Sequence, residues 1–464
     1  MNAFLIYDLT FLVVFTLAVV IFLYTHKKNL QRQGLLYLYR TKIGIKFIDS
    51  FTEKYKKILK PLQYLILTSG YLLMAGMIYL LAKFSWVYLT SPVAAKALKV
   101  PVLIPLVPYL PDLFKLDFLP SFNFTYWIII IAIIAIPHEF AHGIFARLHK
   151  IKVHSTGFGF LGPFLAAFVE PDEKQMAKAK KFPQLSILAA GTFANVIFTV
   201  IFGIILWIFF ISAFAPSGLY FTSYSTSVLN ISQIQIPSDF LNQDFVELSY
   251  QNQTYFASPS VLKQTLDSKL PLIVVYDDTP AFNVKLQGAI THIDGAPITS
   301  LSELTAAIQS HTPGDIISIR TAVQDNVRDN NIEFKDYTLK LGEREGNAFL
   351  GIGIAPIQQQ SGLLGWVFNL ITGIKDPMIY YESSLGALGW FIYYLLWWTV
   401  LICISVALVN MLPVGIFDGG RFFYLTVWSI TGSEKIAKKA FAISTWLILA
   451  LIAALMIKWV LIFI

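Results

Sequence analysis

The sequence predicts a polytopic α-helical membrane protein with about six spans and an inserted extracytoplasmic α+β domain. Of its 464 residues, 56% are apolar and only 14% are charged, whereas soluble domains average about 45–50% and 25%. This excess of apolar residues has no soluble core to hold it, so long apolar runs must face lipid. The composition excludes a disordered chain and a collagen-like fibre, and the single cysteine excludes a disulfide scaffold.

Six apolar runs are long enough to span a membrane, which takes about 20 residues in a helix. The fifth run is too long for one regular span and contains Pro413 and Gly415. We therefore expect a helix, an unwound stretch and a short second helix there. The first run has no basic segment before it, so we expect a retained span and not a cleaved signal. The runs lie near residues 3–25, 62–89, 125–148, 184–214, 386–428 and 440–464.

Basic residues are concentrated in alternate connecting segments. Ten Lys and Arg residues, against Asp49 and Glu53 alone, lie between the first two spans, and smaller basic groups follow the third and fifth spans. Because cationic loops stay in the cytosol, both termini and the long polar segment are expected outside the cell membrane. The net charge of +7 thus indicates topology and contact with membrane lipid, and no nucleic-acid partner is expected.

Four parts are predicted along the chain. The long external part is the only stretch polar enough for a soluble domain, and its first portion, to about residue 270, shows no usable period. The parts are two N-terminal spans with a basic loop (1–123), a first catalytic-core part (124–214), an extracytoplasmic region (215–360), and a second catalytic-core part with the last span (361–464).

A PDZ-like domain is expected at about residues 279–355. The segment GAITHIDGAPITS alternates apolar and polar residues around a turn at Asp294 and Gly295, and a helical segment, Pro-Gly-Asp and another strand follow. This order resembles a PDZ domain of the bacterial protease-associated type. A generic small α+β domain is the alternative.

A metal-binding motif lies inside the third span. Residues 138–142 read HEFAH, so His138 and His142 lie one above the other on a helix and can reach one Zn²⁺. Glu139 is placed to act as general base on water at that metal. Ionisable side chains inside a span cost about 2.5–3.5 kcal/mol each, so three within one turn need a function. A hydrogen-bonded polar cluster between helices is the alternative.

Asp418 is the expected third ligand, because a catalytic zinc site needs three protein ligands and an open position. Among the candidate residues of the other spans, it alone has long apolar stretches on both sides. The Pro and Gly residues before it break the helix, and broken backbone at membrane depth must lie against protein or a wet cavity. Hydrolysis needs such a cavity. The alternative places Asp418 in a cytosolic loop.

These motifs together resemble the site-2 protease family of intramembrane zinc metalloproteases. They are HEFAH, GTFAN at residues 191–195, and the stretch NMLPVGIFDGG at residues 410–420. The resemblance implies one Zn²⁺ per chain, held by His138, His142 and Asp418, with Glu139 as the catalytic base. It also implies that Asn195 and Asn410 bind the substrate backbone or the oxyanion.

A glycine-rich segment between the first two core spans is predicted to form a membrane-associated β-hairpin or looped strand. Residues 155–170 alternate small and bulky side chains around Gly157 and Gly159 and are too apolar for a solvated loop. Such an edge strand gives an unwound substrate helix partners for its freed backbone groups, so both glycines are candidate substrate-binding residues. An interfacial loop that shields the site is the alternative.

The expected function is zinc-dependent endopeptidase cleavage in or near transmembrane segments of membrane-protein substrates, within regulated intramembrane proteolysis. A site-1 protease is expected to trim the substrate first, and the PDZ-like domain to filter it by size or bind its new C-terminus. The alternatives are a surface-active membrane metalloprotease, a transporter that uses the His and Asp cluster as an ion relay, and a scaffold with a vestigial zinc site.

Overall fold

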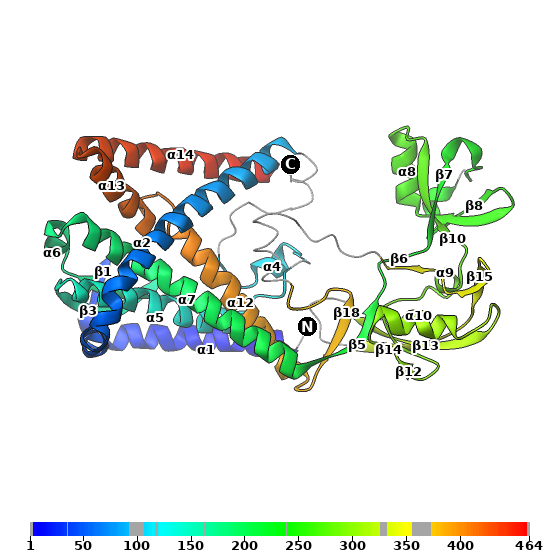
Figure 1. Cartoon of the computed structure of the whole chain (residues 1–464), viewed down its shortest axis with the longest axis horizontal. Helices are drawn as coiled ribbons and strands as arrows, with labels where there is room; N and C mark the ends of the chain where they lie inside the picture. The colour runs from blue at the N-terminus through cyan, green and yellow to red at the C-terminus, as the bar shows by residue number, and fades with distance from the viewer. Residues whose placement is uncertain are drawn as a thin grey trace. The chain divides into compact units, whose positions relative to one another are not determined.

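A computed structural model gives the fold of the chain (Figure 1). It describes residues 3–34, 36–91, 106–116, 119–161, 164–237, 239–324, 332–354 and 373–461. The chain divides into two compact units. The first comprises residues 1–207 and 392–464, and the second comprises residues 208–391. The predicted boundary at residues 360–361 lies outside the described residues.

Among the described residues, six helices are long and apolar enough to cross a membrane, as expected of a polytopic membrane protein. The second is much longer than the predicted run at 62–89, because its 46 residues begin at Ile45 and include the basic stretch before that run. The six helices are α1 (Ala3–Thr25), α2 (Ile45–Thr90), α5 (Phe124–Leu148), α7 (Lys181–Ala213), α12 (Ala387–Val409) and α14 (Glu434–Leu461). Short helices α4 (Leu110–Leu113) and α6 (Glu173–Lys178) lie between them.

The fifth apolar run is broken, as its proline and glycines predict. Helix α12 ends at Val409, a series of turns follows, and α13 (Asp418–Thr431) begins the second piece. The amide of Gly419 donates to the carbonyl of Asn410 at 2.7 Å. A Cβ at Gly419 would overlap the backbone of Met411. The lack of a side chain at Gly419 therefore lets the first turn of α13 pack directly on the preceding loop.

The predicted hairpin at residues 155–170 is present within a larger antiparallel sheet. Strands β3 (Val153–Leu161) and β4 (Phe164–Pro171) pair, and β1 (Leu30–Gln33) and β2 (Leu36–Thr41) extend the sheet in the order β1-β2-β3-β4. The β1–β2 hairpin was not predicted, because its Leu-Tyr-Leu-Tyr alternation lies inside a segment interpreted as a basic loop. Strand β3 is consequently central, and β4 forms one edge of this sheet.

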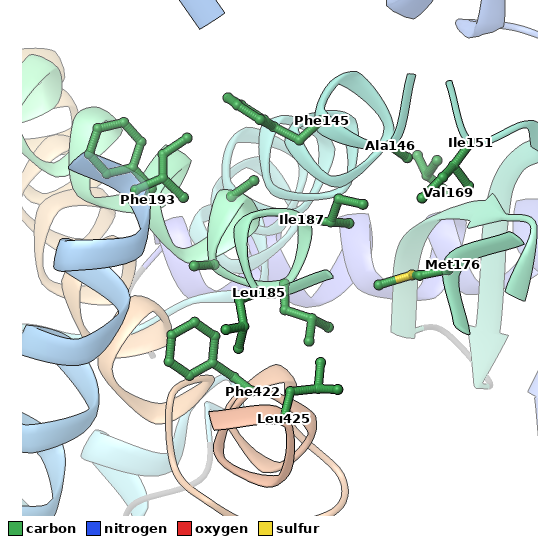
Figure 2. Close-up of a cluster of buried hydrophobic side chains, with 14 of the residues drawn as sticks. Phe145, Ala146, Ile151, Val169, Met176, Leu185, Ile187, Phe193, Phe422 and Leu425 are labelled. Carbon is green, nitrogen blue, oxygen red and sulfur yellow. The ribbon is translucent and has the colours of Figure 1, made fainter. Parts of the chain in front are cut away.

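A buried apolar cluster fixes α7 between the metal-motif helix and the broken segment (Figure 2). Phe145 of α5 and Ile187 of α7 belong to it, as do Leu185 of α7 and Phe422 of α13. Val169 of β4 joins the same cluster. The three helices and the sheet edge that carry the predicted site residues therefore share one core.

The second unit, residues 208–391, contains β-sheets and short helices. One sheet has the order β14-β13-β11-β5-β18 with β12 beside β11, and Asp294 and Gly295 form the predicted turn with φ of 48° and 80°. Its strands are β5 (Phe214–Tyr220), β11 (Ala289–Ile293), β12 (Ala296–Pro297), β13 (Ile316–Gln324), β14 (Ile332–Lys340) and β18 (Ile379–Ser383), with helices α9 (Pro280–Asn283) and α10 (Leu301–Gln309).

The portion up to about residue 270, which shows no usable period in the sequence, contributes to a second four-stranded sheet with the order β7-β10-β9-β8 and to the α-helix α8. Its core contains Val246, Leu262 and Ile273. The elements are β7 (Thr226–Asn230), β8 (Val246–Tyr250), β9 (Gln253–Ala257), α8 (Pro259–Asp267) and β10 (Leu272–Asp277). Two small sheets pair β15 (Gly342–Arg344) with β16 (Asn347–Phe349), and β6 (Ser223–Tyr224) with β17 (Ile352–Gly353).

Candidate metal centre

His138 and His142 lie on successive turns of α5 and point their Nε2 atoms at the same place. The two Nε2 atoms are 3.2 Å apart. The side chains are 8% and 12% exposed, so both imidazoles are inside the protein and close to a shared position. This is the arrangement that the i, i+4 spacing on a helix predicts.

Asp418, the first residue of α13, completes the set. Its Oδ2 lies 3.4 Å from Nε2 of His138 and 3.3 Å from Nε2 of His142. Donor atoms around a tetrahedral Zn²⁺ with bonds of about 2.0–2.1 Å lie about 3.3 Å apart. The three predicted ligands are therefore brought together at the mutual spacing that a zinc ion requires.

The second ring nitrogen of His142 fixes its tautomer. Nδ1 lies 2.7 Å from the carbonyl oxygen of Ile187, so Nδ1 carries the proton and donates it. The lone pair of Nε2 is then free to bind a metal. A hydrogen bond of this kind orients metal-binding histidines and raises their basicity.

Asn195 of α7 contacts Nδ1 of His138, as the Ile187 carbonyl contacts Nδ1 of His142. Its amide group lies 3.0 Å from Nδ1 of His138, and its other polar atom is buried without a partner. If Nε2 of His138 binds a metal, Nδ1 carries the proton and needs an acceptor. A 180° rotation of the Asn195 amide supplies its oxygen as that acceptor and turns the NH₂ group to the unpartnered position. Asn195 thus contacts His138, one of the predicted metal ligands, in addition to any contact with substrate.

Gly191 of α7 faces the two imidazoles directly. A Cβ there would overlap the Nε2 atoms of His138 and His142. The missing side chain leaves open the position on which the three donors converge, so the glycine of the GTFAN motif has a steric role at the centre. This space and the donor set together fit a bound Zn²⁺.

Glu139 lies beside the two histidines and next to the edge strand β4. One carboxylate oxygen of Glu139 and the histidine ring nitrogens lie within 4.8 Å of one another. Its Oε2 accepts a hydrogen bond of 3.1 Å from the amide of Val169 in β4. The carboxylate is therefore adjacent to the metal position, and the backbone amide of Val169 in β4 orients it.

Asn410 is bonded to Gly419, next to Asp418, and also lines an apolar cavity. Its carbonyl oxygen accepts a hydrogen bond from the amide of Gly419, and the residue borders a cavity of about 660 Å³ that Phe417 also lines. The lining residues that the structure describes are apolar apart from Asn410 and Ser405. Examples are Met77, Leu81, Phe122, Trp398 and Ile402, which come from α2, the segment before α5, and α12.

Gly157 and Gly159 lie in the central strand β3, where β2 and β4 occupy both sides of the backbone. A Cβ at Gly157 would overlap the carbonyl oxygen of Tyr39. Their place in the sheet therefore does not support the predicted substrate-binding role of these glycines, because their backbone groups are not at an edge. In the four-stranded sheet, β4 offers an edge close to Glu139.

Sequence reasoning missed the contacts of Ile187 and Val169. Both act through the backbone, and a backbone carbonyl or amide has no signature in the residue type. The apolar cavity was also missed, because its lining residues are typical of any buried helix face.

The profile of peptidase family M50, the site-2 proteases, matches residues 126–455. The chain belongs to this family. The match covers both parts of the metal centre, from α5 to α14, and confirms the resemblance that the three motifs predict.

Named relatives agree with the family assignment. The chain is 25% identical over 216 residues to the zinc metalloprotease RasP of Shouchella clausii, covering 42% of this chain and 50% of that protein. It is 34% identical over 103 residues to two Xylella fastidiosa proteins provisionally named zinc metalloproteases, covering 20% of this chain and 22% of each. The matches thus span half or less of these relatives.

Proposed function

We propose that the protein is a zinc-dependent intramembrane endopeptidase that cleaves peptide bonds in or near transmembrane segments of membrane proteins. The observation that carries this proposal is the convergence of His138, His142 and Asp418, at 3.2–3.4 Å from one another. The two histidines lie on α5, which is long and apolar enough to span a membrane, and Asp418 begins α13, shortly after the apolar helix α12. Membership of family M50 supports the same reaction class.

Each residue of the centre has a separate task in peptide hydrolysis. Bound zinc supplies Lewis-acid chemistry, which acidifies water and polarises a peptide carbonyl. Glu139 accepts the proton of the attacking water on its carboxylate and delivers it to the leaving amine. Asn195 and Ile187 keep the two histidines in the tautomer that leaves Nε2 free. The Asn195 NH₂ group, once rotated, is a candidate donor to the oxyanion.

The substrate is a transmembrane segment that unwinds at the site. A helix hides its peptide bonds in its own hydrogen bonds, so cleavage needs new partners for the freed backbone groups. Strand β4 offers such an edge, because β2 covers the other side of β3. The apolar cavity beside Asn410 and Phe417 accommodates apolar side chains of the same segment.

The basic segments lie in the cytosol and the second unit lies outside the cell membrane. This topology rests on the distribution of Lys and Arg. A PDZ-like part of the second unit then filters substrates or binds the C-terminus that a site-1 protease creates. The protein acts within regulated intramembrane proteolysis, in contact with anionic lipid through its basic segments.

Glu139→Gln tests the proposed reaction. The amide cannot accept the proton but leaves all three ligands in place, so zinc content is expected to stay at one per chain while cleavage of a model transmembrane substrate in detergent falls by about 10³-fold or more. Asp418→Ala is the matched variant, in which zinc content itself is expected to fall. Cleavage at the wild-type rate by Glu139→Gln would reject the assigned base.

A further inference from the structure

We infer that the backbone amide of Val169 in β4 positions the carboxylate of Glu139, and that this contact sets the register in which a substrate strand is cut. The inference rests on the proposed function and goes beyond it, because it specifies which substrate carbonyl is left for the reaction. Val169 is a positioning residue, since it touches Glu139 and not the reacting atoms.

The contact itself is specific. Val169 donates its amide to Oε2 of Glu139 at 3.1 Å. A Cβ at Gly143, one turn after Glu139, would lie 3.1 Å from Cγ1 of Val169. The Val169 side chain is buried in the apolar cluster that Ala146 and Ile187 share. Val169 is therefore packed against the face of α5 that carries Glu139, and it cannot shift without opening this core.

The direction of this amide fixes the directions of its neighbours. Val169 lies opposite Thr156 of β3, yet its amide bonds to Glu139 and so points away from β3. Backbone groups alternate sides along an antiparallel strand. Ala167 and Leu165 therefore also present their amides and carbonyls at the free edge of β4. Leu165 and Ala167 thus face a substrate strand, whereas the amide of Val169 is engaged by Glu139 of α5.

This pattern leaves one substrate carbonyl without a strand partner. A strand added to β4 pairs its backbone with Leu165 and Ala167 in the usual way. The substrate carbonyl opposite Val169 has no donor in the strand, because the amide of Val169 is bonded to Glu139. That carbonyl lies at the end of the ladder, beside the base and the two histidines. The structure thus assigns the scissile bond to the substrate residue opposite Val169.

Removing one hydrogen-bond donor tests this assignment. Proline at 169 lacks the amide, and an edge strand tolerates proline where the amide faces away from the ladder. For Val169→Pro we expect kcat to fall by about tenfold or more, with KM within about twofold and zinc content unchanged. The conservative variant Val169→Ala keeps the amide and should retain kcat within about threefold. Cleavage products are mapped by mass spectrometry.

The results separate a positioning role from a packing role. Loss of kcat in Val169→Pro alone, or cleavage spread over several bonds, supports the inference. Wild-type kcat with a single unchanged cleavage site in Val169→Pro, or equal loss in both variants, overturns it. If Val169→Pro does not fold, an ester in place of the amide between Phe168 and Val169 removes only the N–H, and the same criteria apply. Activity in Glu139→Gln would instead reject the proposed function, so the two failures are distinct.

Discussion

The carboxylate of Asp8 in α1 caps the amino end of α5 by accepting hydrogen bonds from the amides of Phe124 and Thr125. The distances are 2.9 Å to Phe124 and 2.8 Å to Thr125, and Asp8 is 2% exposed. The first amides of a helix have no partner within it and carry the positive end of its dipole. The first span therefore stabilises the helix that carries His138 and His142.

Removal of this cap is expected to destabilise the first unit. Asp8→Ala leaves buried amides without an acceptor, which costs about 1–3 kcal/mol, and Asp8→Asn keeps one oxygen and should lose less. Thr10→Ala is the control, because Thr10 is exposed and its hydroxyl donates to the carbonyl of Ile6 in its own helix. The melting temperature in detergent should fall most in Asp8→Ala, less in Asp8→Asn and least in Thr10→Ala. A melting temperature of Asp8→Ala equal to that of the control would contradict the capping role.

Gly191→Ala is expected to displace the metal. The added methyl group would occupy the space in front of both Nε2 atoms, so zinc affinity should drop by about tenfold or more even though no ligand is changed. Gly203→Ala is the matched control on the same helix, since nothing lies within 4 Å of a Cβ there. Zinc competition with a chelator measures both variants. Wild-type affinity in Gly191→Ala would show that the donors converge elsewhere.

Asn195→Ala removes the partner of Nδ1 of His138. Loss of such an outer contact lowers metal affinity by about 10–100-fold. Asn195→Asp keeps an acceptor oxygen and should hold zinc closer to the wild-type level. Zinc content after dialysis against a weak chelator distinguishes the three proteins. Equal zinc retention in the alanine variant would restrict Asn195 to a contact with substrate.

The elements that the sequence predicts well are those whose signal resides in side chains. Ionisable residues are rare inside apolar runs. The two histidines and Asp418 could therefore be predicted to bind one metal, although 276 to 280 positions separate them in the sequence. The break before Asp418 was visible in Pro413 and Gly415 for the same reason. Packing then brings α5 and α13 together around α7, which no local pattern encodes.

The elements that were missed depend on pairing or on backbone groups. Strand β2 was hidden because it is both basic at Arg40 and amphipathic, and its partner β3 is more than 100 residues away. Strands β7 and β10 are likewise joined across about 45 residues. Contacts of backbone groups such as the Val169 amide follow only from the register of a sheet, which is a tertiary property.

The proposed topology is open to cysteine labelling. Ser310 of the second unit and Lys178 of the first are both exposed, and Cys403 is buried and is replaced by alanine. A membrane-impermeant thiol reagent on intact cells should label Ser310→Cys and leave Lys178→Cys unlabelled, while both react after lysis. Labelling of Lys178→Cys alone would invert the orientation derived from the basic segments.

The edge role of β4 gives the last prediction. Ala167 presents its amide at the free edge, so Ala167→Pro removes one hydrogen bond to an added substrate strand. We expect KM to rise by about fivefold, which corresponds to about 1 kcal/mol, with zinc content unchanged.

Phe160→Pro is the contrasting variant for that prediction. Phe160 is buried in the central strand, opposite Tyr37 of β2 and Leu165 of β4. Its amide therefore points toward β2, and proline there breaks the sheet itself. The melting temperature should fall in Phe160→Pro and change little in Ala167→Pro. If KM in Ala167→Pro equals that of the wild type, the substrate does not pair with this edge, because no other contact replaces the lost donor. If Ala167→Pro loses zinc together with activity, the strand supports the metal centre and not the substrate.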